Sequence, residues 1–117
     1  MSFDEMMAGL KRDYIKSMPD KIQRIQQVYN TADLKQLREE FHKLKGTGKT
    51  YGVPEITDLC AAIEQLCLEQ SPHAINDVKT ALQILGEIHC ARASEQAFNV
   101  VGDKRFTEIQ KHLQGAR

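Results

Sequence analysis

The spacing of the apolar residues constrains the fold of this chain more than any other feature. Apolar side chains recur at intervals of three and four residues, which is the period of a helix, and no stretch alternates with the period of two that is typical of a strand. Only three prolines and seven glycines interrupt the pattern, and they punctuate the periodic segments. The chain is therefore predicted to be all-helical.

Ser17-Met18-Pro19 is expected to separate the first two helices. Residues 3–16 are predicted to form a short helix that ends before this break, because a residue that precedes proline disfavours the helical backbone. Pro19 suits the first turn of a second helix, which is expected to run until the capping residues Asn30 and Thr31.

The best-defined helix is predicted from Ala32 to about Thr50. Its apolar residues follow a three-then-four pattern that forms the narrow seam of a bundle helix: Leu34, Leu37, Phe41, Leu44 and Gly48. Gly52 is expected to stop this helix in a left-handed conformation, and Pro54 to begin the next helix in its first turn.

Ser71-Pro72 combines a cap with a proline and predicts the start of a fourth long helix, which runs to about Ala93. Residues 94–117 form an accessory segment whose pattern allows one more helix after Gly102-Asp103. The simplest architecture is an antiparallel up-and-down four-helix bundle, preceded by the short N-terminal helix and followed by this extension. A chain of 117 residues is expected to form one domain, 1–117.

Charge and composition argue against several classes of protein. Sixteen basic residues balance sixteen acidic ones, so no net field attracts nucleic acid or an acidic membrane. No segment approaches the roughly 20 consecutive apolar residues of a membrane span, and the first residues resemble no secretory signal. The three cysteines include no Cys-x-x-Cys pair, which fits a reducing compartment. We expect a cytoplasmic monomer that binds neither nucleic acid nor membrane.

His42 is the strongest candidate for chemistry. At about 100° per residue it points roughly 130° away from the apolar seam, so it is predicted to face solvent. Three cations lie on the flank between the seam and this histidine: Arg38, Lys45 and Lys49. Such cations stabilise the charge of a phosphoryl group on an imidazole. Gly46, one turn after the histidine, leaves a shallow depression for the approach of another protein.

The run from His42 to Val53 reads His-x-Leu-Lys-Gly-Thr-Gly-x-x-Tyr-Gly-Val. It resembles the signature of the histidine phosphotransfer (HPt) family, and the resemblance extends over roughly residues 6–93. The residues that follow fit the next helix of that family, in which a glutamate is frequent: Ile56, Leu59, Cys60, Ile63 and Glu64. The resemblance implies that His42 is phosphorylated, on the ring nitrogen farther from the backbone.

The same resemblance implies a role for each neighbour of His42. Lys45 and Lys49 would assist charge at the site, and Gly46 and Gly52 would provide clearance and the end of the helix. With Arg38, these two glycines are assigned to partner docking.

The implied function is that of a phosphorelay intermediate in two-component signal transduction. His42 would accept a phosphoryl group from the phospho-aspartate of a receiver domain and pass it to another receiver. The implied partners are response regulator receiver domains or a hybrid sensor histidine kinase, and the Mg²⁺ would belong to the receiver. No nucleotide-binding loop is present, so we expect a phosphoryl carrier without its own cofactor rather than an enzyme.

Other interpretations remain open. The bundle can be an adaptor that binds a receiver or another partner without being phosphorylated, or a purely structural module, and exposed histidines among lysines are commonly passive. The dimerisation helix of sensor kinases is disfavoured, because it typically has Glu and Pro where Lys43 and Thr47 stand here.

No metal site is expected. The four histidines and three cysteines include no His-x-x-x-His or Cys-x-x-Cys pair. Cys60 and Cys67 are interpreted as small core residues, and the Met6-Met7 pair as core or end-cap packing.

Overall fold

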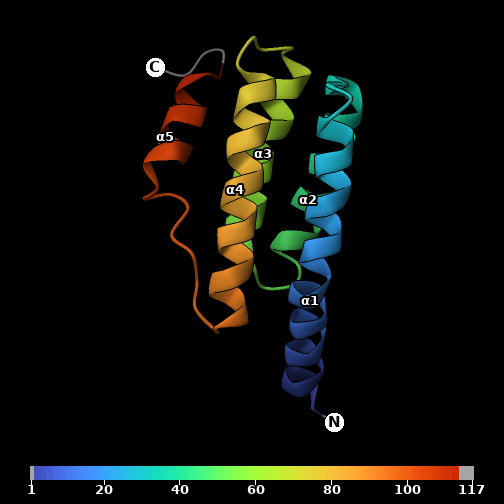
Figure 1. Ribbon diagram of the computed structural model, residues 1–117. Helices are drawn as coiled ribbons and strands as arrows, with labels where there is room; N and C mark the ends of the chain where they lie inside the picture. Colours follow the sequence, from blue (N-terminus) through green and yellow to red (C-terminus); the bar gives the residue numbers. More distant parts are fainter. Residues whose placement is uncertain (1, 114–117) are drawn as a thin grey trace.

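The computed structural model describes residues 2–113, which contain five helices and no strand (Figure 1). The helices are α1 (Phe3–Tyr29), α2 (Leu34–Gly48), α3 (Pro54–Leu68), α4 (Ala74–Ala93) and α5 (Lys104–Lys111). The prediction of an all-helical fold is confirmed. None of the helices in the described part of the chain is long and apolar enough to cross a bilayer.

The four long helices lie side by side, and the turns that join them lie at alternate ends of the molecule (Figure 1). Each of them packs against two others, and the contact between α2 and α3 is the most extensive. All four contribute large, fully buried side chains: Met18, Leu37, Phe41, Ile56, Leu59, Ile63, Leu66, Ile84, Leu85 and Ile88. The apolar seams predicted from the sequence therefore meet in one core.

The predicted break before Pro19 is wrong, because α1 continues through this residue from Phe3 to Tyr29. A proline inside a helix removes one hydrogen bond and crowds the carbonyl four residues earlier, here that of Ile15. Ile15 and Met18 before the proline and Ile25 and Val28 after it are buried, so packing on both sides of the proline outweighs this local cost. The short N-terminal helix and the first bundle helix are thus one element of 27 residues.

The first turns of α1 also differ from expectation. Met6 was expected to pack in the core or at its end, but it is 45% exposed. Met7 is half-buried.

The start of α2 lies two residues later than predicted, at Leu34. Ala32 has a φ of 55°, outside the helical region. Asp33 is the N-cap, since its Oδ1 accepts hydrogen bonds from the backbone amides of Lys35 and Gln36 at 3.0 and 3.2 Å. This side chain satisfies amides that have no partner within the helix.

The turn between α2 and α3 fixes these two helices relative to each other. Gly52 has a φ of 81°, as the predicted left-handed stop requires. At Gly48 a Cβ would lie 2.8 Å from Thr57 Oγ1, so only glycine allows the helices to approach this closely. Thr57 Oγ1 accepts from the backbone N–H of Lys49 at 2.8 Å and donates to the carbonyl of Lys45 at 2.9 Å. These two hydrogen bonds therefore link the end of α2 to the start of α3.

The helix that the sequence allowed after Gly102-Asp103 is present as α5, and it buries Phe106 and Ile109. The segment that precedes α5, residues 94–103, is hydrogen-bonded to α3 through the buried carboxylate of Glu55. That carboxylate accepts from Arg92 Nε and Nη2 at 2.8 and 2.7 Å and from the Phe98 N–H at 3.1 Å. Burial disfavours the charged form of Glu55, but these hydrogen bonds outweigh it and hold its pKa below the ordinary value.

Candidate functional site

His42 lies in the middle of α2 and projects into solvent, as the helical projection predicted. Its side chain is 66% exposed, whereas Phe41 and Leu44 on the seam are buried. Its Nδ1 is hydrogen-bonded to the carboxylate of Glu64 on α3, at 3.0 Å from Oε1 and 3.3 Å from Oε2. Its Nε2 makes no hydrogen bond to any residue of the range 2–113.

Glu64 connects the histidine to Lys45. The Lys45 Nζ lies 2.8 Å from Oε2 of this glutamate, whose side chain is only 15% exposed. Burial disfavours the charged carboxylate, but the hydrogen bonds from Lys45 and His42 outweigh it and lower the pKa of Glu64. The carboxylate is therefore ionised at neutral pH and stands between an imidazole and an ammonium group.

This contact determines which ring nitrogen of His42 is available. An ionised carboxylate can only accept hydrogen bonds, so the proton of the neutral imidazole resides on Nδ1. The lone pair is then on Nε2, which is the nucleophilic nitrogen of this tautomer. Because two helices hold the ring through Glu64, the nucleophile has a defined direction towards solvent.

The structure places the other predicted site residues at different distances from His42. Arg38 borders the same surface hollow as the histidine, together with Glu39, Lys43 and Glu64. Gly46 opens the adjoining surface, since a Cβ there would meet no atom within 4 Å. Lys49 is exposed, and its side chain forms no hydrogen bond or ion pair with His42 or Glu64. Gly52 lies in the turn after α2, beside the side chain of Lys11.

Three residues of this hollow were assigned no role from the sequence, and one of them is Glu39 on α2. Lys43 follows the histidine directly and borders the hollow from α2. Glu64 stands 22 positions along the chain, on another helix. The only signal for it was the glutamate that is frequent in the resembling family, because its distance from His42 depends on how α2 and α3 pack.

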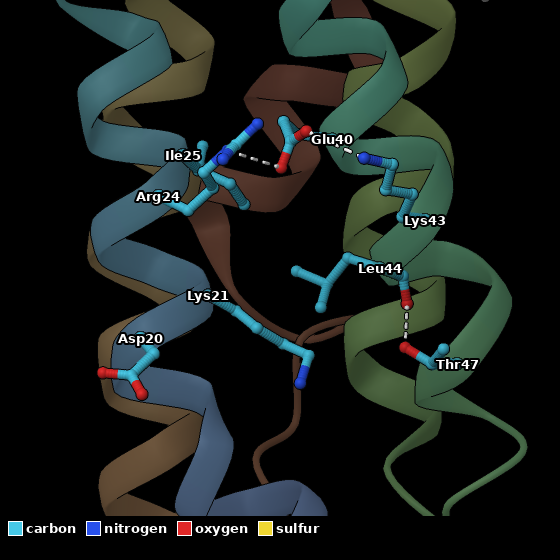
Figure 2. A pocket seen from close by; sticks show the side chains of 8 residues that line it. All are labelled: Asp20, Lys21, Arg24, Ile25, Glu40, Lys43, Leu44 and Thr47. Carbon is cyan, nitrogen blue, oxygen red and sulfur yellow. Dashed lines mark hydrogen bonds and ion pairs between the residues drawn. The ribbon is translucent and has the colours of Figure 1, made fainter.

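A second hollow lies between α1 and α2 on the other side of Lys43, and Figure 2 shows the side chains that line it: Asp20, Lys21, Arg24, Ile25, Glu40, Lys43, Leu44 and Thr47. Ile25 and Leu44 are buried apolar residues. Glu40 stands between two cations, 3.6 Å from Arg24 Nε and 3.3 Å from Lys43 Nζ. The histidine is thus next to a groove with apolar residues at its base and charges along its rim.

The other histidines and cysteines do not assemble around a metal position. Within residues 2–113 no group of three or more His, Cys, Asp or Glu side chains is arranged to hold an ion. Cys60 and Cys67 are buried, as core residues would be, and burial raises the pKa of both thiols, that of Cys67 to about 11. His112 stacks on His73 with ring centroids 3.9 Å apart.

The family to which the chain belongs bears on the interpretation of this surface. The family model described as Hpt domain matches residues 9–99. The chain belongs to the Hpt domain family. No curated protein and no solved structure gives a significant match.

Hpt domains carry phosphoryl groups in two-component phosphorelays and are not kinases, and they interact there with receiver domains or kinases. The match includes α1 from its second turn, all of α2, α3 and α4, and the segment that follows α4. The His42 site therefore lies entirely within the Hpt domain, and α5 lies outside it.

Proposed function

We propose that Nε2 of His42 accepts a phosphoryl group from the phospho-aspartate of one receiver domain and passes it to an aspartate of a second receiver. The observation that carries this proposal is the contact between Nδ1 and the ionised Glu64, which leaves Nε2 free on an exposed histidine of an Hpt domain. The chain acts as a carrier and takes no phosphate from ATP.

The transfer exchanges one bond to phosphorus for another. The Nε2 lone pair forms the N–P bond while the P–O bond to the aspartate breaks, and the aspartate leaves as a carboxylate with the electron pair. The ring of His42 then carries phosphorus on Nε2 and the proton on Nδ1. Glu64 balances the positive charge that develops on this ring. The onward transfer to the second receiver is the same reaction in reverse.

Cations of α2 oppose the negative charge of the phosphoryl group. Arg38 and Lys43 border the hollow around His42 and are placed to meet the phosphoryl oxygens. Lys45 holds Glu64 in position and adds charge at the site. Lys49 is seven residues after the histidine, so it lies about 10 Å along the same helical face. We propose that it adds positive charge to the surface on which the partner docks. The Mg²⁺ of the reaction is assigned to the receiver, so this chain needs no cofactor of its own.

The partner docks on the surface around α2. Gly46 leaves open surface one turn from His42, and Gly52 ends α2 so that the chain turns away. The groove between α1 and α2 offers the apolar Ile25 and Leu44 beside a charged rim. A contact of modest area with this composition is typical of transient complexes.

The proposal is tested by incubating the protein with labelled phospho-receivers from a panel of the same genome. Wild type is expected to gain a label that is stable in base and lost in acid, as a phosphoramidate is, and His42→Gln is expected to gain none. His89→Gln is the matched control, because His89 is partly exposed and forms no hydrogen bond or ion pair with another of residues 2–113. Binding without label would identify an adaptor, and neither binding nor label would identify a structural module.

A further inference from the structure

The first turns of α1 carry an apolar stripe that the bundle leaves uncovered. Phe3, Met6 and Leu10 are 70%, 45% and 40% exposed, and Met7 between them is half-buried. Spacings of three and four residues place these side chains on one face of the helix. Such a contiguous apolar face is characteristic of an interaction surface.

The first turns of α1, which carry the stripe, extend past the ends of the other long helices (Figure 1). Tyr14, one turn after the stripe, is already buried. Lys11 lies beside Gly52 in the turn between α2 and α3, and Ala8 borders a hollow with Glu95, just after the end of α4. The other long helices therefore end near the level of residues 8–11, and the turns before that level project into solvent.

The charges next to the stripe follow an order along the helix. Asp4 and Glu5 occupy the first turn, and Lys11 and Arg12 follow two turns later. A separation of seven residues leaves Asp4 and Lys11 within about 20° of each other around the helix, on the same flank of the stripe. Neither of these two side chains forms an ion pair or hydrogen bond with another of residues 2–113.

We infer that two copies of this chain pair antiparallel through the stripe. With the two-fold axis near Met6 and Met7, Phe3 of one copy meets Leu10 of the other, and Asp4 meets Lys11 on the flank. Both contacts then occur twice, as two-fold symmetry requires. In a parallel pair related by a two-fold axis, the flank that carries Asp4 and Lys11 faces the opposite flank of the partner helix, so the Asp4–Lys11 contact does not form. The order of the charges therefore favours the antiparallel arrangement, in which this contact forms twice.

The size of the stripe sets the strength of this contact. About two helical turns from each copy bury far less surface than a stable interface does, so we expect a dissociation constant of roughly 0.1–1 mM. Below that range the protein is the monomer that the sequence predicted. His42 lies six residues before Gly48, the last residue of α2, so it is about 9 Å along that helix from the turn beside Lys11, and pairing leaves the phosphorylation site open.

Sedimentation equilibrium at concentrations below and above this range tests the inference. Phe3→Glu and Leu10→Glu are each expected to raise the dissociation constant at least about tenfold, because they place a carboxylate in the apolar contact. Leu68→Glu is the matched control. Leu68 is 55% exposed and is the last residue of α3, which ends at the other end of the bundle from the first turns of α1 (Figure 1), so this change is expected to have no effect.

Two further experiments test the direction of pairing. Asp4→Lys and Lys11→Asp should each weaken the dimer, and the double exchange should restore it. In a Cys90→Ser background, which removes the exposed thiol, a mixture of Phe3→Cys and Leu10→Cys proteins should form a disulfide-linked dimer, whereas Phe3→Cys alone should not.

Several results would overturn the inference. One is a sedimentation mass that remains that of a monomer at the highest concentration. This result overturns the inference even if the stripe then binds lipid vesicles or another protein. Equal weakening by Leu68→Glu would show that the stripe is not the contact. A disulfide between two Phe3→Cys copies would show that the helices pair in parallel.

Discussion

Replacing Glu64 by glutamine tests the arrangement at His42 most directly. The carboxylate lies 3.0 Å from His42 Nδ1 and 2.8 Å from Lys45 Nζ. Glutamine has nearly the same shape and keeps an acceptor for Nδ1, but it cannot balance the charge that develops on the ring while Nε2 attacks phosphorus. We therefore expect slower phosphoryl transfer by a protein that remains folded.

The magnitude follows from the exposure of the contact. A hydrogen bond to a charged group contributes about 1.5–3 kcal/mol. The His42 side chain is 66% exposed, so solvent screens the interaction and the loss should lie near the lower limit, at about 1.4 kcal/mol, or roughly tenfold in rate. Glu64→Leu also removes the acceptor that fixes the tautomer, and it should approach a 100-fold loss.

The measurement is the single-turnover rate of transfer from a labelled phospho-receiver, with thermal melts to verify the fold. Asp58→Asn is the matched control, because it removes an acidic charge from an exposed position of the same helix that does not border the hollow of His42. If Glu64→Gln transfers within about twofold of wild type, or if Asp58→Asn slows transfer equally, the contact does not position the nucleophile.

Lys45→Ala should slow transfer a few-fold in the same assay without changing the melting temperature, because the Lys45 side chain is 33% exposed and its ion pair contributes little to stability; a large drop in melting temperature would contradict this. Gly46→Leu should weaken receiver binding in calorimetry by more than about tenfold in a folded protein, since a Cβ there meets no atom within 4 Å; unchanged affinity would remove Gly46 from the docking surface. Arg92→Ala should lower the free energy of unfolding in urea by about 3 kcal/mol at neutral pH, because buried Glu55 would keep only the Phe98 N–H. The folded-state pKa of Glu55 is lowered, so its stabilising contribution is present above the unfolded value and is lost as pH falls through the folded value. The difference in the free energy of unfolding between wild type and Arg92→Ala should therefore become smaller below about pH 4.5. A difference that does not change with pH would refute the stabilising role of the Glu55–Arg92 ion pair.

The sequence predicted the helices and the exposure of His42 for one physical reason. Helical spacing determines which side chains can be buried together, and the burial of Leu37, Phe41 and Leu44 leaves the histidine on the outer face. The continuity of α1 was not predictable in this way. The rule that proline breaks a helix is local, whereas the burial of Ile15 and Met18 that overrides it depends on helices distant in the sequence.

The contact of Glu64 with His42 was not predicted, for a related reason. Helical projection gives the direction of His42 on its own helix but not its partner 22 positions away. That partner is set by the register between α2 and α3, which depends on the close approach at Gly48 and on the two hydrogen bonds of Thr57. The nucleophile is thus oriented through packing six residues beyond the histidine, about 9 Å along the helix. If His42 is the phosphoryl carrier proposed here, Gly48 contributes to phosphotransfer by positioning Glu64, although it touches no reacting atom.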